Sequence, residues 1–374
     1  MTFLADQEGK VKMQRRAFLK KAGIGLAAGA GVAALPALAE SMPEVKWRMA
    51  SSFPKSLDTI FGGAEQLAKR VANLTQGKFQ IRVFAGGEIV PGLQVLDAVQ
   101  QGTVQCGHTA GYYYVGKNKA FAFDTALPFG MAARQQNAWY YYGGGLQLLR
   151  DFYKGYGIVN FPGGNTGTQM GGWFRKPINS LADLKGVKMR IPGIGGEIMS
   201  RLGVVPQSLP GGDIYPALEK GTIDAAEWVG PYDDEKLGLY KVAKHYYYPG
   251  WWEGGVTLSF LINSKEWEKL PDLYKEAFEV AAAEANLHML AEYDAKNPAA
   301  LGRLLHGGAV LHPYPVDLMK AALKVAHEIY DEEAARNPAF KKIYEPWKRF
   351  RNDEFQWFRI AETSYDNFAF NNVK

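Results

Sequence analysis

The chain has 374 residues, 47% of them hydrophobic and 13% aromatic, enough for about two packed domains at ~100–200 residues each. Its formal net charge of +5 comes largely from residues 1–39, which carry six basic and two acidic side chains; the other 335 residues have 37 basic and 36 acidic ones. This near-neutral balance argues against a nucleic-acid partner. The single cysteine, Cys106, excludes an internal disulfide and a cysteine-based metal cluster.

The first 39 residues have the pattern of an export signal. Arg15 and Arg16 lie in a Gln-Arg-Arg-Ala-Phe-Leu-Lys segment of twin-arginine form, followed by an apolar run over residues 22–35 and by Ala-Leu-Ala at 37–39, which is typical of a cleavage site. A membrane anchor is the alternative, but this run is shorter than the ~20 residues of a membrane-spanning helix. We therefore expect a periplasmic protein that begins near Glu40.

Strand and helix patterns then alternate. Residues 46–51 are a candidate strand, and apolar residues at helical spacing over 60–74 predict a helix that Ser56 caps and Gly77 ends. Apolar and polar residues alternate over 79–83, as in a strand. This βαβ order predicts a mainly parallel sheet.

Two segments about 120 residues apart have similar patterns. Residues 96–105 and 215–224 each predict a helix end, a glycine (Gly102 or Gly221) with positive φ, and the start of a strand. We interpret them as parts of two similar α/β lobes; convergence on a common joint is the alternative.

Apolar and basic residues alternate over 187–191, and Arg190 lies at the end of this candidate strand, just before Pro192. Ligands of open α/β sheets bind beyond the carboxyl ends of strands, where a guanidinium can hold a carboxylate through two parallel hydrogen bonds. From the residues alone, the alternative is that Arg190 lies with Lys188 on an ordinary solvated face of the strand.

Two glutamates are candidate cation ligands. Glu227 follows a short apolar segment, and Glu253 lies in an almost uncharged aromatic stretch, where a carboxylate must be paired, protonated or bound to a cation. With the amide oxygen of Gln169 and a main-chain carbonyl such as that of Trp228, they form a ligand set for a hard cation. Pairing with lysines or a position at the rim of the cleft is one alternative, and a glycosidase-like carboxylate pair is another.

Three further features allow two interpretations each. Asn165 and Thr166 lie on a glycine-rich loop and either donate to a ligand or only form the turn. The tyrosine runs at 112–114 and 246–248 predict packed core, with one or two rings at a cleft wall. From about residue 267 the chain is mostly helical, and near its end one helical stripe fits either packing on its own subunit or a dimer interface. The stripe consists of Phe355, Phe358, Ala361, Tyr365 and Phe368.

Several segments resemble the DctP-type solute-binding subunits of tripartite ATP-independent periplasmic (TRAP) transporters. The general likeness lies in residues 50–54 and 221–228 and in the strand ending at Arg190. Residues 161–167, 228–236 and 246–255 are similar to the branch that binds 2-oxo monocarboxylates such as pyruvate, or lactate. The resemblance extends over essentially the whole mature chain.

The resemblance implies an α/β periplasmic binding fold with two lobes, a hinge and a helical C-terminal region. We expect lobe 1 over 44–162 and 256–300, lobe 2 over 163–255, and C-terminal helices over 301–374. The implied function is capture of a small organic acid, without catalysis, for delivery to the TRAP membrane permease.

The resemblance also assigns roles to residues. It implies that Arg190 binds the carboxylate and that Glu227, Trp228, Glu253 and Gln169 hold a cation that touches the ligand. Asn165 completes the expected substrate site. Sodium is the expected cation, with calcium as the alternative.

The resemblance further implies a homodimer formed by exchange of the C-terminal helix. Two other functions remain open: the binding subunit of an ATP-driven importer, which shares the fold, and a periplasmic enzyme. No dinucleotide fingerprint, phosphate loop or serine elbow in the sequence supports an enzyme.

Overall fold

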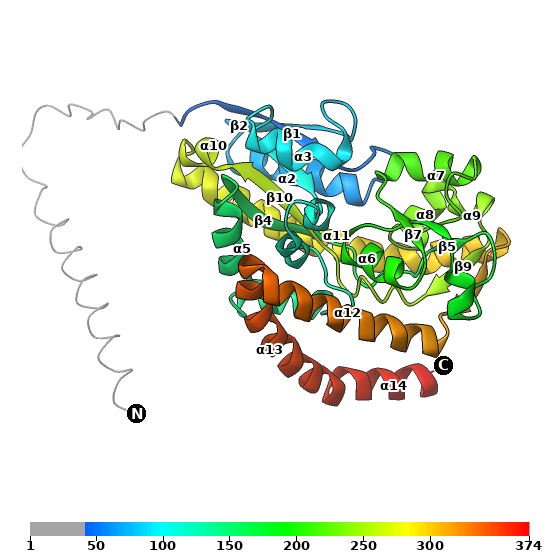
Figure 1. Ribbon diagram of the computed structural model, residues 1–374. Helices are drawn as coiled ribbons and strands as arrows, with labels where there is room; N and C mark the ends of the chain where they lie inside the picture. The colour runs from blue at the N-terminus through cyan, green and yellow to red at the C-terminus, as the bar shows by residue number, and fades with distance from the viewer. Residues whose placement is uncertain (1–41, 374) are drawn as a thin grey trace, which may run out of the picture. The chain divides into compact units, whose positions relative to one another are not determined.

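The computed structural model describes residues 42–373, so the predicted export signal lies outside the described residues. These residues form two mixed β-sheets with helices packed around them (Figure 1). Sheet A has the strand order β2-β1-β3-β10-β4, and sheet B has the order β11-β9-β5-β8-β6-β7. Among the described residues, no helix combines the length and apolar character needed to cross a bilayer.

The strands of sheet A are β1 (Val45–Ser51), β2 (Phe79–Phe84), β3 (Cys106–Thr109), β4 (Ile158–Asn165) and β10 (Thr257–Asn263). Those of sheet B are β5 (Trp173–Phe174), β6 (Lys188–Arg190), β7 (Val205–Gln207), β8 (Ala225–Ala226), β9 (His245–Tyr248) and β11 (Val310–Pro313). The α-helices are α2 (Ile60–Leu74), α3 (Val95–Gln100), α4 (Ala133–Tyr141), α5 (Gly145–Lys154), α6 (Gly193–Arg201), α7 (Gly211–Glu219), α8 (Pro231–Leu237), α9 (Leu239–Val242), α10 (Ser264–Glu268), α11 (Asp272–His306), α12 (Val316–Arg336), α13 (Pro338–Ile360) and α14 (Glu362–Asn372). A 3₁₀-helix, η2 (Gly111–Tyr114), follows β3.

The first βαβ unit has the predicted form. Strands β1 and β2 pair in parallel, and α2 connects them. Gly77 has φ 78° after the helix end, as expected of a residue in the left-handed region. The predicted cap was wrong: Thr59 is the N-cap of α2, no side chain caps it, and Ser56 lies three residues earlier. The helix depends instead on its buried apolar face.

The prediction of a mainly parallel sheet holds only in part. Five strand pairs in the described residues are parallel and four are antiparallel. The antiparallel pairs all involve β5 or β10. Both strands directly follow a segment that crosses from one sheet to the other, which local periodicity does not reveal.

The two similar helix-to-strand joints are confirmed. Gly102 after α3 has φ 73°, and Gly221 after α7 has φ 71°. The following amide donates in each case to the same position of its helix: Thr103 N to Ala98 O and Thr222 N to Ala217 O, both at 2.9 Å. One joint leads into β3 of sheet A and the other into β8 of sheet B.

Two segments without helices cross between the sheets: residues 166–172 join β4 to β5, and residues 249–256 join β9 to β10. A third connection, from β10 to β11, contains α10 and α11. The first crossing segment starts where the second ends, because Asn165 at the end of β4 pairs with Thr257 at the start of β10. The lobe boundaries stay a prediction. Within 301–374 the predicted C-terminal helices are present as α12, α13 and α14, and β11, which pairs with β9, is an additional strand.

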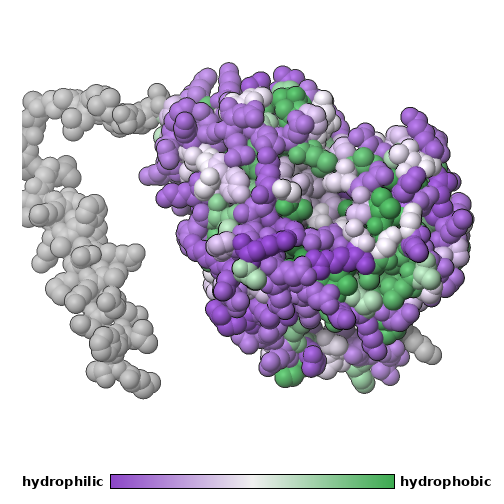
Figure 2. All heavy atoms as spheres, viewed as in Figure 1, coloured by the Kyte–Doolittle hydropathy of each residue, from purple (hydrophilic) through white to green (hydrophobic). Residues whose placement is uncertain are grey.

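The C-terminal helices pack on one another at one edge of the molecule (Figure 1). Helix α12 contacts α6 and α13, while α13 also contacts α4 and α5. Helix α14 has no buried residue. Figure 2 shows apolar side chains at the lower edge, where Figure 1 places α13 and α14.

We expect Gly163→Ala to lower the free energy of unfolding by ~1–3 kcal/mol, the usual cost of overpacking a core. An added Cβ at Gly163 in β4 would overlap the buried ring of Phe260 on the neighbouring strand β10. Gly62→Ala in α2 is the matched control, because a Cβ there meets nothing within 4 Å. Urea unfolding of both variants checks this; equal midpoints would contradict tight packing at Gly163.

Candidate functional site

The predicted site residues come together at the carboxyl ends of β6 and β8. Arg190 ends β6 and pairs in register with Ala226 of β8. Glu227, the residue after Ala226, therefore lies beside Arg190. Gln169 and Glu253 reach the same place from the two crossing segments, where Gln169 N donates to Glu253 O at 3.1 Å. All four side chains are buried.

Arg190 is held by protein acceptors on one side. Its Nε donates to Leu209 O at 3.0 Å, and its Nη1 donates to Glu227 O at 3.1 Å and forms an ion pair with the Glu227 carboxylate. The guanidinium also lies over the Trp228 ring, 5.0 Å from its centroid. The interpretation of a solvated strand face is therefore wrong, because the side chain is only 1% exposed.

The same contacts limit how Arg190 can bind a ligand. Nη2 has no hydrogen-bond partner in the structure, whereas Nε and Nη1 are engaged. The two N–H groups of Nη2 therefore have no partner among the described residues, and binding of a carboxylate through two parallel hydrogen bonds stays a prediction.

The two glutamates are close enough to affect each other. Burial and the neighbouring Glu227 raise the pKa of Glu253 well above its usual range, against the opposing charge of Arg190. Burial also raises the pKa of Glu227, while Arg190 counteracts the shift. Pairing with lysines is wrong for Glu227, whose partner is Arg190. The Oε2 atom of Glu227 has no hydrogen-bond partner within residues 42–373.

Gln169 brings oxygen atoms together. Glu253 Oε2 and Trp228 O both lie 2.5 Å from one terminal atom of its side-chain amide. Without a cation, this atom is the amide nitrogen, which donates to both oxygens, while the amide oxygen accepts from Thr166 Oγ1 at 3.0 Å. In the opposite orientation the amide oxygen would join these two oxygens as a ligand for a hard cation such as sodium or calcium.

A cavity of about 10 Å³ adjoins these residues and is large enough for about one water molecule. Tyr112 and Tyr113 from η2 line it together with Gln169 and Trp228. Burial raises the pKa of Tyr113 to about 12, so it stays a neutral hydroxyl. A larger ligand therefore requires movement of the surrounding groups. The sequence did not specify which tyrosines lie here.

The side chains of Asn165 and Thr166 form hydrogen bonds at the turn where β4 ends. Asn165 Oδ1 accepts from Gly167 N at 2.8 Å, and its Nδ2 donates to Thr257 Oγ1 at 3.3 Å. Thr166 Oγ1 bonds to Gly167 O and to the side-chain amide of Gln169. These bonds form the turn and orient Gln169; a direct contact of Asn165 with the ligand stays a prediction.

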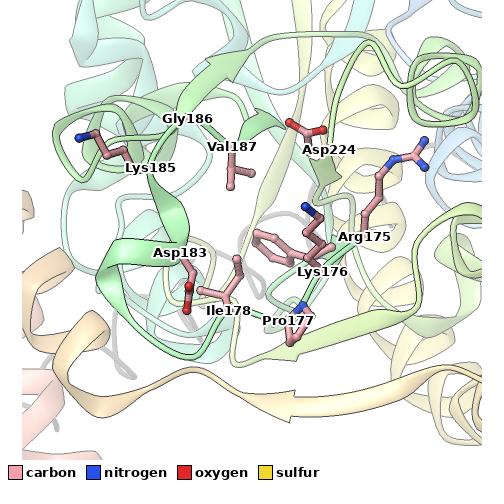
Figure 3. A pocket seen from close by; sticks show the side chains of 10 residues that line it. Arg175, Lys176, Pro177, Ile178, Asp183, Lys185, Gly186, Val187 and Asp224 are labelled. Atoms are coloured by element: carbon pink, nitrogen blue, oxygen red, sulfur yellow. The ribbon is translucent and has the colours of Figure 1, made fainter.

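A larger pocket of about 320 Å³ lies at the opposite ends of β6 and β8 (Figure 3). Its charged groups do not converge, since Lys185 and Arg175 point to opposite sides. The carboxylate of Asp183 is bound by two backbone amides, and that of Asp224 accepts from Lys188 N. A ligand site at Arg190 therefore stays the prediction.

Two groups near the site had no role assigned from the sequence. Leu209 contributes a main-chain carbonyl, for which no side-chain signal exists. Asp233 and Asp234 are fully buried and hydrogen-bonded around Trp228 and Val229. Two adjacent acidic residues after an aromatic, Gly- and Pro-containing segment were the available signal.

The chain is similar to known binding proteins over nearly its full length. A family model for bacterial extracellular solute-binding protein, family 7, matches residues 50–337. A monocarboxylate 2-oxoacid-binding periplasmic protein of Nostoc sp. is 57% identical over 361 residues, which cover 96% of this chain and 99% of that protein.

Solved structures show the same fold. A TRAP transporter solute-binding protein of Bordetella bronchiseptica, a mixed-occupancy dimer with copurified calcium and picolinate, has a TM-score of 0.88 and 57% identity, covering 88% of this chain and 98% of that one. A TRAP periplasmic solute-binding protein of Pseudoalteromonas atlantica with bound sodium and pyruvate has a TM-score of 0.83 and 38% identity, covering 86% and 98%. The chain therefore belongs to family 7 of the bacterial extracellular solute-binding proteins.

Proposed function

We propose that the protein captures a 2-oxo monocarboxylate together with a metal cation and delivers it to the membrane permease of a TRAP transporter. One observation carries this proposal: Nη2 of Arg190, which has no partner among the described residues, lies in the same buried site as the oxygens of Glu253 and Trp228 that converge on the Gln169 amide. The family consists of transport receptors rather than enzymes. The glycosidase-like interpretation and the ATP-driven importer therefore have no support.

Each group of the site has a specific role in this proposal. Nη2 of Arg190 would donate to the ligand carboxylate. Glu227, Glu253, Gln169 and the carbonyl of Trp228 would hold the cation, which supplies positive charge to two buried carboxylates and an anionic ligand. Tyr112, which is buried, and Tyr113, which is partly buried, would exclude water from the site and strengthen these interactions.

The ligands of two relatives point to one chemical class. Pyruvate accompanies sodium in one structure and picolinate accompanies calcium in another. Each acid carries a second donor atom on the carbon next to its carboxylate, so both can chelate a cation through a five-membered ring. Formal charge favours calcium, because three carboxylates against Arg190 leave −2. Sodium was expected from the sequence, and both cations remain in the proposal.

The protein acts outside the cytoplasm, as its family does. We propose the twin-arginine route for its export on the basis of Arg15 and Arg16. These residues lie outside the described part of the chain.

We also propose a homodimer through the C-terminal helices. Tyr365 and Phe368 of α14 are 71% and 69% exposed, and Phe355 of α13 is also exposed. Packing on the same subunit accounts for only part of the stripe: Phe358 lies under Arg134 of α4, whereas Phe355, Tyr365 and Phe368 stay exposed. So many large apolar side chains in water favour a protein partner, and the Bordetella relative is a dimer. The stripe is also divided, because α13 ends at Ile360 and α14 begins at Glu362.

Arg190→Lys should weaken binding of pyruvate about ten-fold or more, since one ammonium cannot keep the bonds to Leu209 and Glu227 and also bind the ligand. Isothermal titration calorimetry measures the affinity, and thermal unfolding verifies the fold. Arg201→Lys, at a surface ion pair with Glu332, is the matched control. An unchanged dissociation constant for Arg190→Lys would remove Arg190 from ligand binding.

Cation and organic acid should tighten each other by the same factor, because the coupling free energy is reciprocal. Calorimetry with 2-oxo and 2-hydroxy acids on chelator-treated protein, with sodium, calcium or neither, measures this factor. Glu253→Gln should weaken both ligands, whereas Glu219→Gln at the exposed end of α7 should weaken neither. Equal acid affinity under all three conditions would exclude a role for the cation.

The double substitution Tyr365→Asp and Phe368→Asp should halve the mass measured by light scattering, because charge on the apolar stripe would oppose association. Leu287→Asp on α11, where Leu287 is 66% exposed, should leave the mass unchanged. A monomeric wild type, or a double variant that remains dimeric, would refute this interface.

A further inference from the structure

Asp233 and Asp234 form a fully buried acidic pair in the first turn of α8. No salt bridge to either residue is present in the described part of the chain. Burying carboxylates without a cationic partner is costly, so the hydrogen bonds that they accept must compensate. Those bonds come almost entirely from residues around the proposed site.

Asp234 connects sheet B to the segment that carries Trp228. Its Oδ2 accepts from Trp173 Nε1 at 2.9 Å and from Tyr246 OH at 2.7 Å. These two rings stack at 3.8 Å on the paired strands β5 and β9. Its Oδ1 accepts from Val229 N at 3.3 Å. One carboxylate thus ties the Val229 amide to two adjacent strands.

This bond determines where the Trp228 carbonyl points. The carbonyl of Trp228 and the N–H of Val229 belong to the same planar peptide group, so holding the N–H also holds the carbonyl. That carbonyl is one of the oxygens 2.5 Å from the amide of Gln169. A carboxylate bound to the N–H also polarises the peptide, which makes the carbonyl a stronger cation ligand.

Asp233 holds the side chain of the same residue. Its Oδ2 accepts from Trp228 Nε1 at 3.2 Å and from Tyr293 OH of α11 at 2.8 Å. The indole lies against the guanidinium of Arg190. Both the ring and the carbonyl of Trp228 are therefore oriented by neighbouring carboxylates of α8.

An ordinary role in stabilising the helix is the alternative, because acidic residues favour the first turn of a helix. The bonds of Asp234 argue against this role alone. They come from Val229, Trp173 and Tyr246, all of which lie outside α8, and Gly230, the N-cap residue, is not bonded by either carboxylate.

We propose that Asp234 is a positioning residue of the cation site, which aims and polarises the Trp228 carbonyl, and that Asp233 holds the Trp228 ring against Arg190. The proposal rests on the proposed function of the same site. It predicts that loss of the Asp234 charge weakens the cation even in the absence of an organic acid.

Asp234→Asn should weaken calcium or sodium about 10–100-fold, the usual effect of losing an outer partner of a metal ligand. Calorimetry with each cation alone, on chelator-treated protein, measures the affinity. Asp183→Asn is the matched control, because Asp183 also accepts backbone amides but lies at the surface away from the site. Thermal unfolding of the cation-free variants establishes that they fold.

A spectroscopic signal separates positioning from mere stability. Trp228-Val229 is the sole Trp-Val pair in the sequence, so labelling Trp with ¹³C at the carbonyl and Val with ¹⁵N isolates this peptide group by NMR. The Trp228 carbonyl signal should shift when the cation binds, and Asp234→Asn should move it in the cation-free protein. Tyr246→Phe, which removes one donor to Asp234, should cause smaller changes in the same direction.

The outcomes are distinct. A wild type that binds neither cation would overturn the proposed function and this inference together. A wild type that binds the cation, with unchanged affinity and carbonyl signal in Asp234→Asn, would overturn the inference alone.

Discussion

The buried ion pair between Arg190 and Glu227 is the interaction on which the site depends. Both side chains are almost completely removed from water, and such a pair is tolerated only when further hydrogen bonds compensate for lost hydration. Leu209 O, Glu227 O and the Trp228 ring supply that compensation on one side of the guanidinium. The other side keeps a nitrogen without a partner, so the arrangement that stabilises the charge also exposes a donor to the ligand.

The chain path combines this anchor with groups from the connections between the sheets. Arg190 ends β6 of sheet B and Glu227 directly follows β8, whereas Gln169 and Glu253 lie on the two crossing segments. These segments bond to each other through Gln169 N and Glu253 O. A ligand that contacts Arg190 and the cation ligands would therefore join a sheet to its connections, which is how closure around a solute can be coupled to binding.

The buried carboxylates also explain why the site needs several layers of support. Burial, and next the nearby charge of Glu227, raises the pKa of Glu253 well above its usual range. Asp233 and Asp234 lie behind Trp228 and are bound by the hydroxyl or indole groups of Trp173, Tyr246 and Tyr293. The aromatic richness of the chain thus supplies hydrogen-bond donors for buried acids as well as packed core.

Sequence by itself determined the features that depend on neighbours along the chain: the first βαβ unit, the positive φ of Gly102 and Gly221, and a strand ending at Arg190. Helix period, strand alternation and turn chemistry are local, so residues a few positions apart reveal them. Tertiary structure decided what depends on distant contacts, such as the antiparallel β10, the use of Nε and Nη1 of Arg190, and the bond of Asp234 to Tyr246. Which acceptors surround a buried charge is set by backbone groups from several elements, and no spacing in the sequence encodes their directions.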